Sequence, residues 1–258
     1  MEGMPSTPAR LRPTIVALAT AITAALALPA LSTPHDTTVP TAASAGPVYS
    51  GKGWKANTAG GMYSLNPAGY TIVFANSTAR SVLTKYVTTP AAQLASITGF
   101  RYTVTTTIDT TPIGTCPPKG RIIIEYIYRP IGTRGASNAR VCANRADGSV
   151  WGARVQMDSE YWSTPNWFST NPTINEVYRK NLVTHELGHA AGLDHPNRDL
   201  DRDGKIEPYE CDKNTSGWLP IVCSPNGGIR TTQYAGKFTA LEVPGLRQMA
   251  TNWYLRQG

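Results

Sequence analysis

The histidines of this 258-residue chain are gathered in one short segment, because three of the four lie within residues 185–195. His185 and His189 are four residues apart, so on a helix they lie on one face, one turn from each other. Gly192 tolerates positive φ, so the helix can end there and the chain can turn back to bring in His195. The spacing therefore predicts a helix that ends shortly after His189 and three imidazoles that meet at one point.

Three neutral imidazoles are the ligand set of a catalytic zinc site, because they leave the fourth position of the ion open to water. Glu186 directly follows the first histidine, so its carboxylate can reach a water on the metal without binding the metal itself. The alternative is ordinary histidines in accidental register, but the one other histidine, His35, lies far upstream. We predict His185, His189 and His195 as zinc ligands and Glu186 as the general base.

Residues 185–195 read His-Glu-Leu-Gly-His-Ala-Ala-Gly-Leu-Asp-His, which resembles the HExxHxxGxxH signature of the metzincin zinc endopeptidases. The stretches 181–184 and 238–254 look most like the matrixin branch, and Pro196 is similar to serralysins. The resemblance is loose over 70–254 and sharp only at the motif. It implies an α+β, metzincin-like fold: a twisted mixed sheet of about five strands, an active-site helix carrying HExxH, and a C-terminal helix. The implied activity is that of a zinc metalloendopeptidase.

The chain departs from the metzincin pattern in two places. That family carries a methionine in a tight turn beneath the metal, but Met249, the one methionine after the motif, falls within a stretch that is itself helical in pattern. The turn can instead be 221–225, with Val222 in place of methionine. In addition, no cysteine precedes Cys116, so a thiol latch on the zinc from a pro-segment is not expected.

A second motif follows the histidines at 199–210, where oxygen-bearing groups occupy positions 1, 3, 5, 9 and 12 of a twelve-residue loop, as in an EF-hand calcium loop. Gly204 stands at the sixth position, where that loop turns sharply. The predicted calcium ligands are the side chains of Asp199, Asp201, Asp203 and Glu210, the carbonyl of Lys205, and Glu207 directly or through water. The alternative is a solvated acidic loop, in which such crowded carboxylates repel one another. We predict a structural calcium ion that helps to hold His195.

The chain has four cysteines, which all lie well beyond the N-terminal residues: Cys116, Cys142, Cys211 and Cys223. Their spacing lacks the CxxC pairs of a cysteine-ligated zinc site. An even number in an exported chain indicates disulfide bonds, with three possible pairings. Sequence order favours Cys116 with Cys142 and Cys211 with Cys223.

The N-terminal residues have the composition of a secretory signal peptide. Arg10 and Arg12 precede an apolar run over 14–31, which small residues follow. We expect the signal to span 1–32, and a second candidate cleavage position lies as late as residue 45. The alternative is an uncleaved anchor, because the run is nearly long enough to cross a bilayer. The expected protein is secreted and keeps no stable membrane association after cleavage.

Beyond the leader, 33–69 is rich in Thr, Pro, Ala and Gly, which is typical of an irregular segment. The zinc metalloprotease domain is expected over 70–258, with the calcium loop inserted in it. Strand-like patterns occur at 70–75, 101–108, 121–128 and 150–157. Together they predict a mixed sheet with helices packed on it.

Three helices are expected in this domain. The first ends at Gly99, with Thr89 and Pro90 as its N-cap and first turn. The second begins at a capping box over 173–176 and runs without Gly or Pro toward the histidine motif. The third is the terminal helix at 242–253.

Charge excludes one class of function. The net charge of +7 comes from 24 Lys and Arg against 17 Asp and Glu, but the basic residues are mostly scattered singly and form no block that could track phosphates, so nucleic-acid binding is not expected. The predicted protein is a monomeric, secreted zinc endopeptidase that acts on protein or peptide substrates. The alternatives are a zinc amidase of cell-wall peptides and a catalytically silent, metal-stabilised binding domain.

Overall fold

The computed structural model describes residues 46–255. The predicted signal peptide over 1–32, its late cleavage position at residue 45, and His35 lie outside the described residues. Among the described helices, none combines the length and apolar character that a membrane crossing requires.

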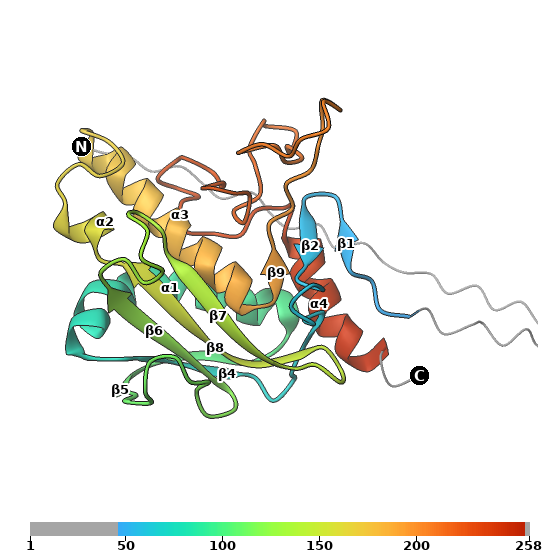
Figure 1. The fold of residues 1–258 in the computed structure, drawn as a ribbon, viewed down its shortest axis with the longest axis horizontal. Helices are drawn as coiled ribbons and strands as arrows, with labels where there is room; N and C mark the ends of the chain where they lie inside the picture. Colours follow the sequence, from blue (N-terminus) through green and yellow to red (C-terminus); the bar gives the residue numbers. More distant parts are fainter. Residues whose placement is uncertain (1–45, 256–258) are drawn as a thin grey trace, which may run out of the picture. The chain divides into compact units, whose positions relative to one another are not determined.

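The main sheet has six strands (Figure 1). Neighbours are parallel along the path β3 (Ser64–Leu65), β8 (Ser149–Asp158), β6 (Arg121–Ile127), β4 (Tyr70–Phe74) and β5 (Tyr102–Ile108). The sixth strand, β7 (Asn138–Asn144), pairs antiparallel with β8. The predicted α+β class and mixed sheet are confirmed. The strand number is higher than the predicted five because β3 and β7 come from segments that carry no clear strand pattern.

Helix α1 (Ser77–Thr98) is twice as long as the sequence pattern predicts. Its N-cap is Asn76, whose side chain accepts from the backbone N–H of Ala79 at 2.8 Å, so the predicted cap at Thr89 is wrong. Pro90 lies inside the helix, although it removes one backbone hydrogen bond. The helix continues because its apolar face is buried on the sheet through Leu83, Val87 and Leu94. The predicted stop at Gly99 is confirmed, with φ of 73°.

Residues before position 70 are more ordered than their composition indicates. Strands β1 (Ser50–Gly51) and β2 (Trp54–Ala56) form a hairpin, and β2 pairs antiparallel with β9 (Leu193–Asp194). The expectation of an irregular segment over 33–69 is therefore corrected for its described part. This small sheet joins the N-terminal hairpin to the strand that immediately precedes His195.

The core lies between the sheet and three helices. Helices α1 and α3 (Pro172–Ala190) cover one face of the main sheet, and α4 (Val243–Leu255) closes its end beside β3 (Figure 1). A short helix, α2 (Glu160–Ser163), follows β8. The predicted helix that carries the histidine motif and the predicted C-terminal helix are both present.

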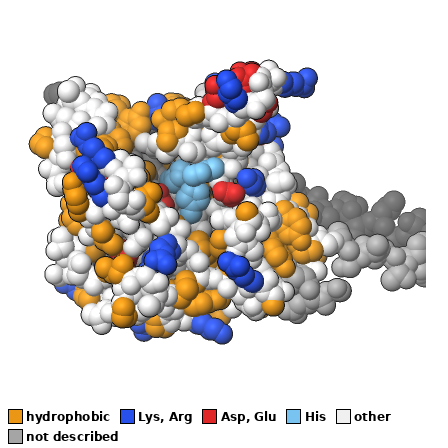
Figure 2. Space-filling view, viewed as in Figure 1, with side chains coloured by type: hydrophobic (Ala, Val, Ile, Leu, Met, Phe, Trp, Pro, Cys, Tyr) orange, Lys and Arg blue, Asp and Glu red, His pale blue; other side chains and the backbone are white. Residues whose placement is uncertain are grey.

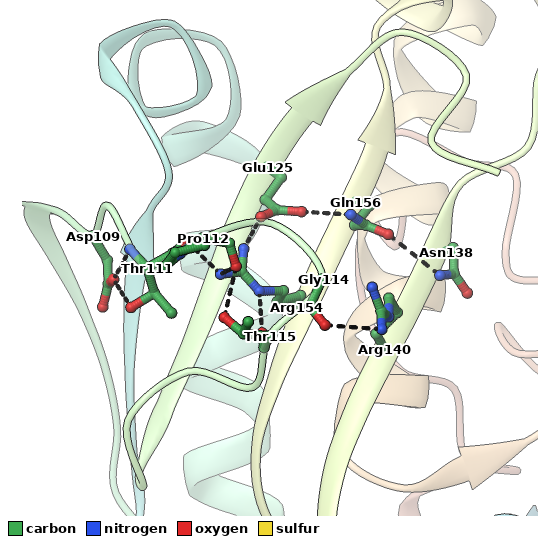
Figure 3. A network of polar contacts seen from close by, with 10 residues as sticks. All are labelled: Asp109, Thr111, Pro112, Gly114, Thr115, Glu125, Asn138, Arg140, Arg154 and Gln156. Atoms are coloured by element: carbon green, nitrogen blue, oxygen red, sulfur yellow. Dashed lines mark hydrogen bonds and ion pairs between the residues drawn. The ribbon is translucent and has the colours of Figure 1, made fainter. Parts of the chain in front are cut away.

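The opposite face of the sheet carries a buried polar network around Arg154, whose side chain is almost completely buried (Figure 3). Its guanidinium forms an ion pair with Glu125 on β6 and donates to carbonyls of the loop that precedes β6. The acceptors are the carbonyl oxygens of Thr115, Thr111 and Pro112, at 2.7, 2.5 and 2.8 Å. Gln156 continues the network by donating to Glu125 at 2.7 Å. The loop is thereby fixed to the sheet without an apolar core of its own.

We predict that Arg154→Met destabilises the fold by about 3–5 kcal/mol, because it leaves the Glu125 carboxylate buried without its cation. Urea unfolding measures the change. Arg145→Met is the control: Arg145 is exposed, so its loss changes stability by less than about 0.5 kcal/mol. Equal effects of the two substitutions would contradict a structural role for the Arg154 network.

Candidate metal centre

Helix α3 delivers the first part of the histidine motif. It begins at Asn171, whose side chain accepts from the backbone N–H of Thr173 at 2.9 Å. The predicted capping box at 173–176 is therefore wrong, and Glu176 instead accepts from the Tyr86 hydroxyl of helix α1 at 2.9 Å. Helix α3 therefore begins after Asn171 and contacts α1 through Glu176.

The end of α3 brings in the third histidine. Gly192 has φ of 85°, and its N–H donates to the carbonyl of His189 at 2.8 Å. A Cβ at this glycine would lie 2.5 Å from Cε of Met249, so a larger residue would have to displace that side chain as well as adopt a left-handed backbone conformation. The chain then enters β9, pairs with β2 and returns His195 to the helix.

The three imidazoles converge as the spacing predicts. The Nε2 atoms of His185 and His189 are 3.0 Å apart, and that of His195 lies 3.1 Å from His189 and 3.2 Å from His185. Nδ1 of His185 donates to the carbonyl of Ile221, and Nδ1 of His189 to the carbonyl of Leu193, both at 2.8 Å. These bonds place the protons on Nδ1, so the Nε2 lone pairs face the common centre. Figure 2 shows the rings at the surface of the molecule.

This arrangement fits a metal ion. Burial lowers the pKa of all three imidazoles, that of His189 to about 4, and the neighbouring rings lower those of His185 and His189 further. The rings are therefore neutral near pH 7, and the lone pairs facing one another at about 3 Å repel unless a cation lies between them. Neutral imidazole nitrogens of this kind are metal ligands, and the three residues form a group that could hold a metal ion.

Glu186 lines the same cavity, which has a volume of about 380 Å³. Its side chain is buried and has no hydrogen-bond partner among the described residues. Burial raises the pKa of Glu186 to about 8, which disfavours its charged form in the absence of a nearby cation. A divalent cation on the three histidines acts in the opposite direction and favours the carboxylate.

The outer wall of the cavity comes from residues that the sequence did not indicate. Gly135, on the loop before β7, is held from both sides. Its N–H donates to the buried Asp158 at 2.8 Å, and its carbonyl accepts from the Tyr161 hydroxyl at 2.6 Å. Asp158 and Tyr161 come just after the predicted strand at 150–157. A polar or aromatic residue directly after a buried strand was the sequence signal from which these two could have been found.

The turn at 221–225 lies beneath the histidines, as one of the two alternatives predicts. Val222 packs so closely on the helix that a Cβ at Gly188 would lie 2.5 Å from its Cγ1. Met249 is instead a buried residue of α4 that contacts Gly192. The carbonyl next to Val222, that of Ile221, is the acceptor for His185.

A buried carboxylate that the sequence did not single out holds this turn. Glu242 is fully buried, and it accepts from the backbone N–H of Val222 at 3.3 Å. Its other oxygen accepts from the N–H and hydroxyl of Thr239, at 2.8 and 2.5 Å. Burial raises the pKa of Glu242 to about 7, although these three donors oppose the shift.

The acidic loop brings three of its predicted calcium ligands together. Carboxylate oxygens of Asp199, Asp201 and Asp203 lie within 4.8 Å of one another, a group that could hold a metal ion. Glu207 and Glu210 lie outside that group. Glu210 instead accepts from backbone amides of the loop, those of Glu207 at 2.9 Å and Asp201 at 3.3 Å, and these hydrogen bonds lower its pKa. The N–H of Lys205 donates to Asp203 at 2.8 Å.

Both predicted disulfide bonds are present, Cys116–Cys142 and Cys211–Cys223. Their Cα atoms are 6.0 and 6.2 Å apart. The second bond connects the residue after the acidic loop to the turn at 221–225, so the two candidate metal sites share one covalent link.

Comparisons with known proteins do not assign this chain to a family. No family model matches this chain, and no curated protein matches it. A solved chain described as "GM1 bound form of the ECX AB5 holotoxin" matches with a TM-score of 0.36 and 12% identity, over 77% of this chain and 84% of that chain. A likeness at this TM-score carries no argument about the fold or activity of the present protein.

The metzincin assignment is corrected, because neither a family model nor a curated protein places this chain in that family. The resemblance of 181–195 to that family's signature is confined to a short motif.

We predict that Glu242→Ala weakens the binding of added Zn²⁺ about ten-fold, because His185 loses its oriented acceptor when the Val222 turn is released. Competition with a chelator measures the affinity. Asp109→Ala is the matched control, since it removes another buried carboxylate with its hydrogen bonds to Thr111 and Arg121, in a loop that does not line the histidine cavity. An equal loss of affinity in both variants would attribute the effect to general destabilisation.

Proposed function

We propose that this protein is a zinc-dependent endopeptidase. The observation that carries the proposal is the meeting of three neutral Nε2 atoms in a cavity that also holds the buried Glu186. A structural zinc site is closed by four protein ligands, whereas three imidazoles beside an unbonded carboxylate match a catalytic site. Zinc bound in this way lowers the pKa of water to about 7 and polarises a carbonyl oxygen.

The chain's own residues have separate tasks in this reaction. His185, His189 and His195 hold the metal, and the carbonyls of Ile221 and Leu193 fix two of the rings in orientation. Glu186 accepts a proton from the attacking water and then delivers it to the amine nitrogen that leaves.

The edge of the sheet favours a peptide as the substrate. Strand β7 pairs only with β8 in the described part of the chain, and Asn138, Ala139 and Val141 of this strand line the cavity. An extended peptide can add to such an edge through main-chain hydrogen bonds and lie across the histidines. A zinc amidase of cell-wall peptides uses the same metal and base but does not need a strand to pair with. A silent binding domain does not need Glu186.

We further propose that the protein is secreted and acts as a monomer. Two disulfide bonds support an oxidising compartment.

We predict that Glu186→Gln keeps zinc but lowers kcat by about 10²–10⁴-fold, because the amide cannot accept the proton. Hydrolysis of an unfolded protein substrate measures activity, and elemental analysis measures bound zinc. Glu176→Gln changes a partly exposed carboxylate of the same helix and is expected to retain activity. Undiminished cleavage by the Glu186 variant would remove this residue from its proposed role, and a chelator-resistant activity would remove the metal.

We also propose that the loop at 199–210 binds a structural calcium ion. The support is the cluster of Asp199, Asp201 and Asp203. The loop begins shortly after His195, and the Cys211–Cys223 bond fixes its far end. Without a cation the three carboxylates repel one another, so calcium is expected to order the loop.

We predict that removal of calcium, with zinc left in place, lowers Tm by about 5 °C or more, as loss of a ligand present at about 100 times its Kd does for a domain of this size. Differential scanning calorimetry with and without a calcium-selective chelator measures the change. Asp201→Asn is expected to reduce the calcium response. Unchanged Tm and unchanged protease resistance would show that the loop is only a solvated acidic segment.

A further inference from the structure

A second cavity, of about 640 Å³, lies beside the candidate metal centre. It opens between the β1–β2 hairpin and the segment that follows His195, and its lining includes Trp54, Pro196 and Asn197. The boundary between the two cavities is the pair formed by Lys55 on β2 and Asp194 on β9, whose Nζ and Oδ2 are 3.1 Å apart. A bound peptide that passes over the histidines can therefore continue into this second cavity.

The lining of the second cavity is basic. It carries three cations, Lys52, Lys55 and Arg198, against one carboxylate, Asp212. Asp212 is already engaged, since it pairs with Arg198 at 2.6 Å and accepts from the backbone N–H of Gly53 at 3.1 Å. Lys52 is exposed and has no ion-pair partner among the described residues. One ammonium group is thus left without a counter-charge at the mouth of a cavity.

The cations of this cavity lie close to the metal centre. Lys55 pairs with Asp194, the residue that directly precedes His195 and lines the first cavity. Figure 2 shows acidic and basic side chains bordering the histidines. A bound anionic group in the second cavity would lie near Lys52 and Lys55 and meet N–H donors that their present contacts leave unused.

We propose that this cavity is a subsite for an acidic side chain, Asp or Glu, of a peptide substrate, with Lys52 as the residue that selects its charge. The proposal rests on the proposed endopeptidase function. The paired cations Lys55 and Arg198 define the shape of the subsite, because their carboxylate partners hold them in place. Lys52 supplies the net positive charge that distinguishes Glu from the isosteric Gln.

The test uses pairs of peptides that are identical except for Glu or Gln at one position, scanned over four residues on each side of the cleaved bond. The zinc-loaded protein is expected to cleave the Glu peptide about three- to ten-fold better in kcat/KM at one position, and the preference is expected to shrink in 0.5 M NaCl. Lys52→Glu is expected to abolish or reverse the preference.

Lys119→Glu is the control, because it makes the same charge change at an exposed lysine that does not line the cavity. It is expected to keep the preference. Cleavage of all peptides with equal kcat/KM for Glu and Gln, or loss of the preference in both lysine variants, would overturn the subsite while the proposed function stands. Absence of cleavage of every peptide by the zinc-loaded protein would overturn the proposed function itself, and the subsite with it.

Discussion

The convergence of three imidazole nitrogens on one point is the constraint around which the rest of this structure is arranged. Each Nε2 atom that faces the centre lies 3.0–3.2 Å from the two others, a spacing that suits ligands of one shared cation. The surrounding structure holds the rings in place. Carbonyl acceptors fix two of them, and the turn at Gly192 and the β9 strand fix the position of the third.

The scaffold around the rings uses polar groups where apolar packing is not available. Arg154 and Glu125 attach a loop to the outer face of the sheet, and Glu242 attaches the Val222 turn to the start of helix α4. Both devices bury charge, which is favourable only if every partner is present. The polar interior therefore fixes the arrangement more than it adds to stability.

Local patterns predicted much of this structure, and the failures have physical causes. The spacing of His185, His189 and His195 was sufficient because helix geometry alone relates the first two. The order of the cysteines was sufficient for both disulfide bonds. The start of α1 was missed because Pro90 was taken as a boundary, whereas burial of an apolar face outweighs the bond it removes. Glu242 could not be found because its role depends on the turn at Val222, a separate segment of the chain, whereas the position of Asp158 just after a strand pattern was a signal that the prediction did not use. The family assignment failed because a short motif says little about the remaining residues.

The pairing of β2 with β9 connects the N-terminal hairpin to the strand that leads to His195. The N–H and carbonyl of Val48 bind the side chain of Asn252, and the hairpin that follows runs beside the strand leading to His195. Proteolytic trimming that stopped before Val48 would leave both the Val48–Asn252 hydrogen bonds and the β2–β9 pairing intact. Trimming past Ala56 would remove the strand that pairs with β9, so the position of His195 depends on chain far upstream of the histidine motif.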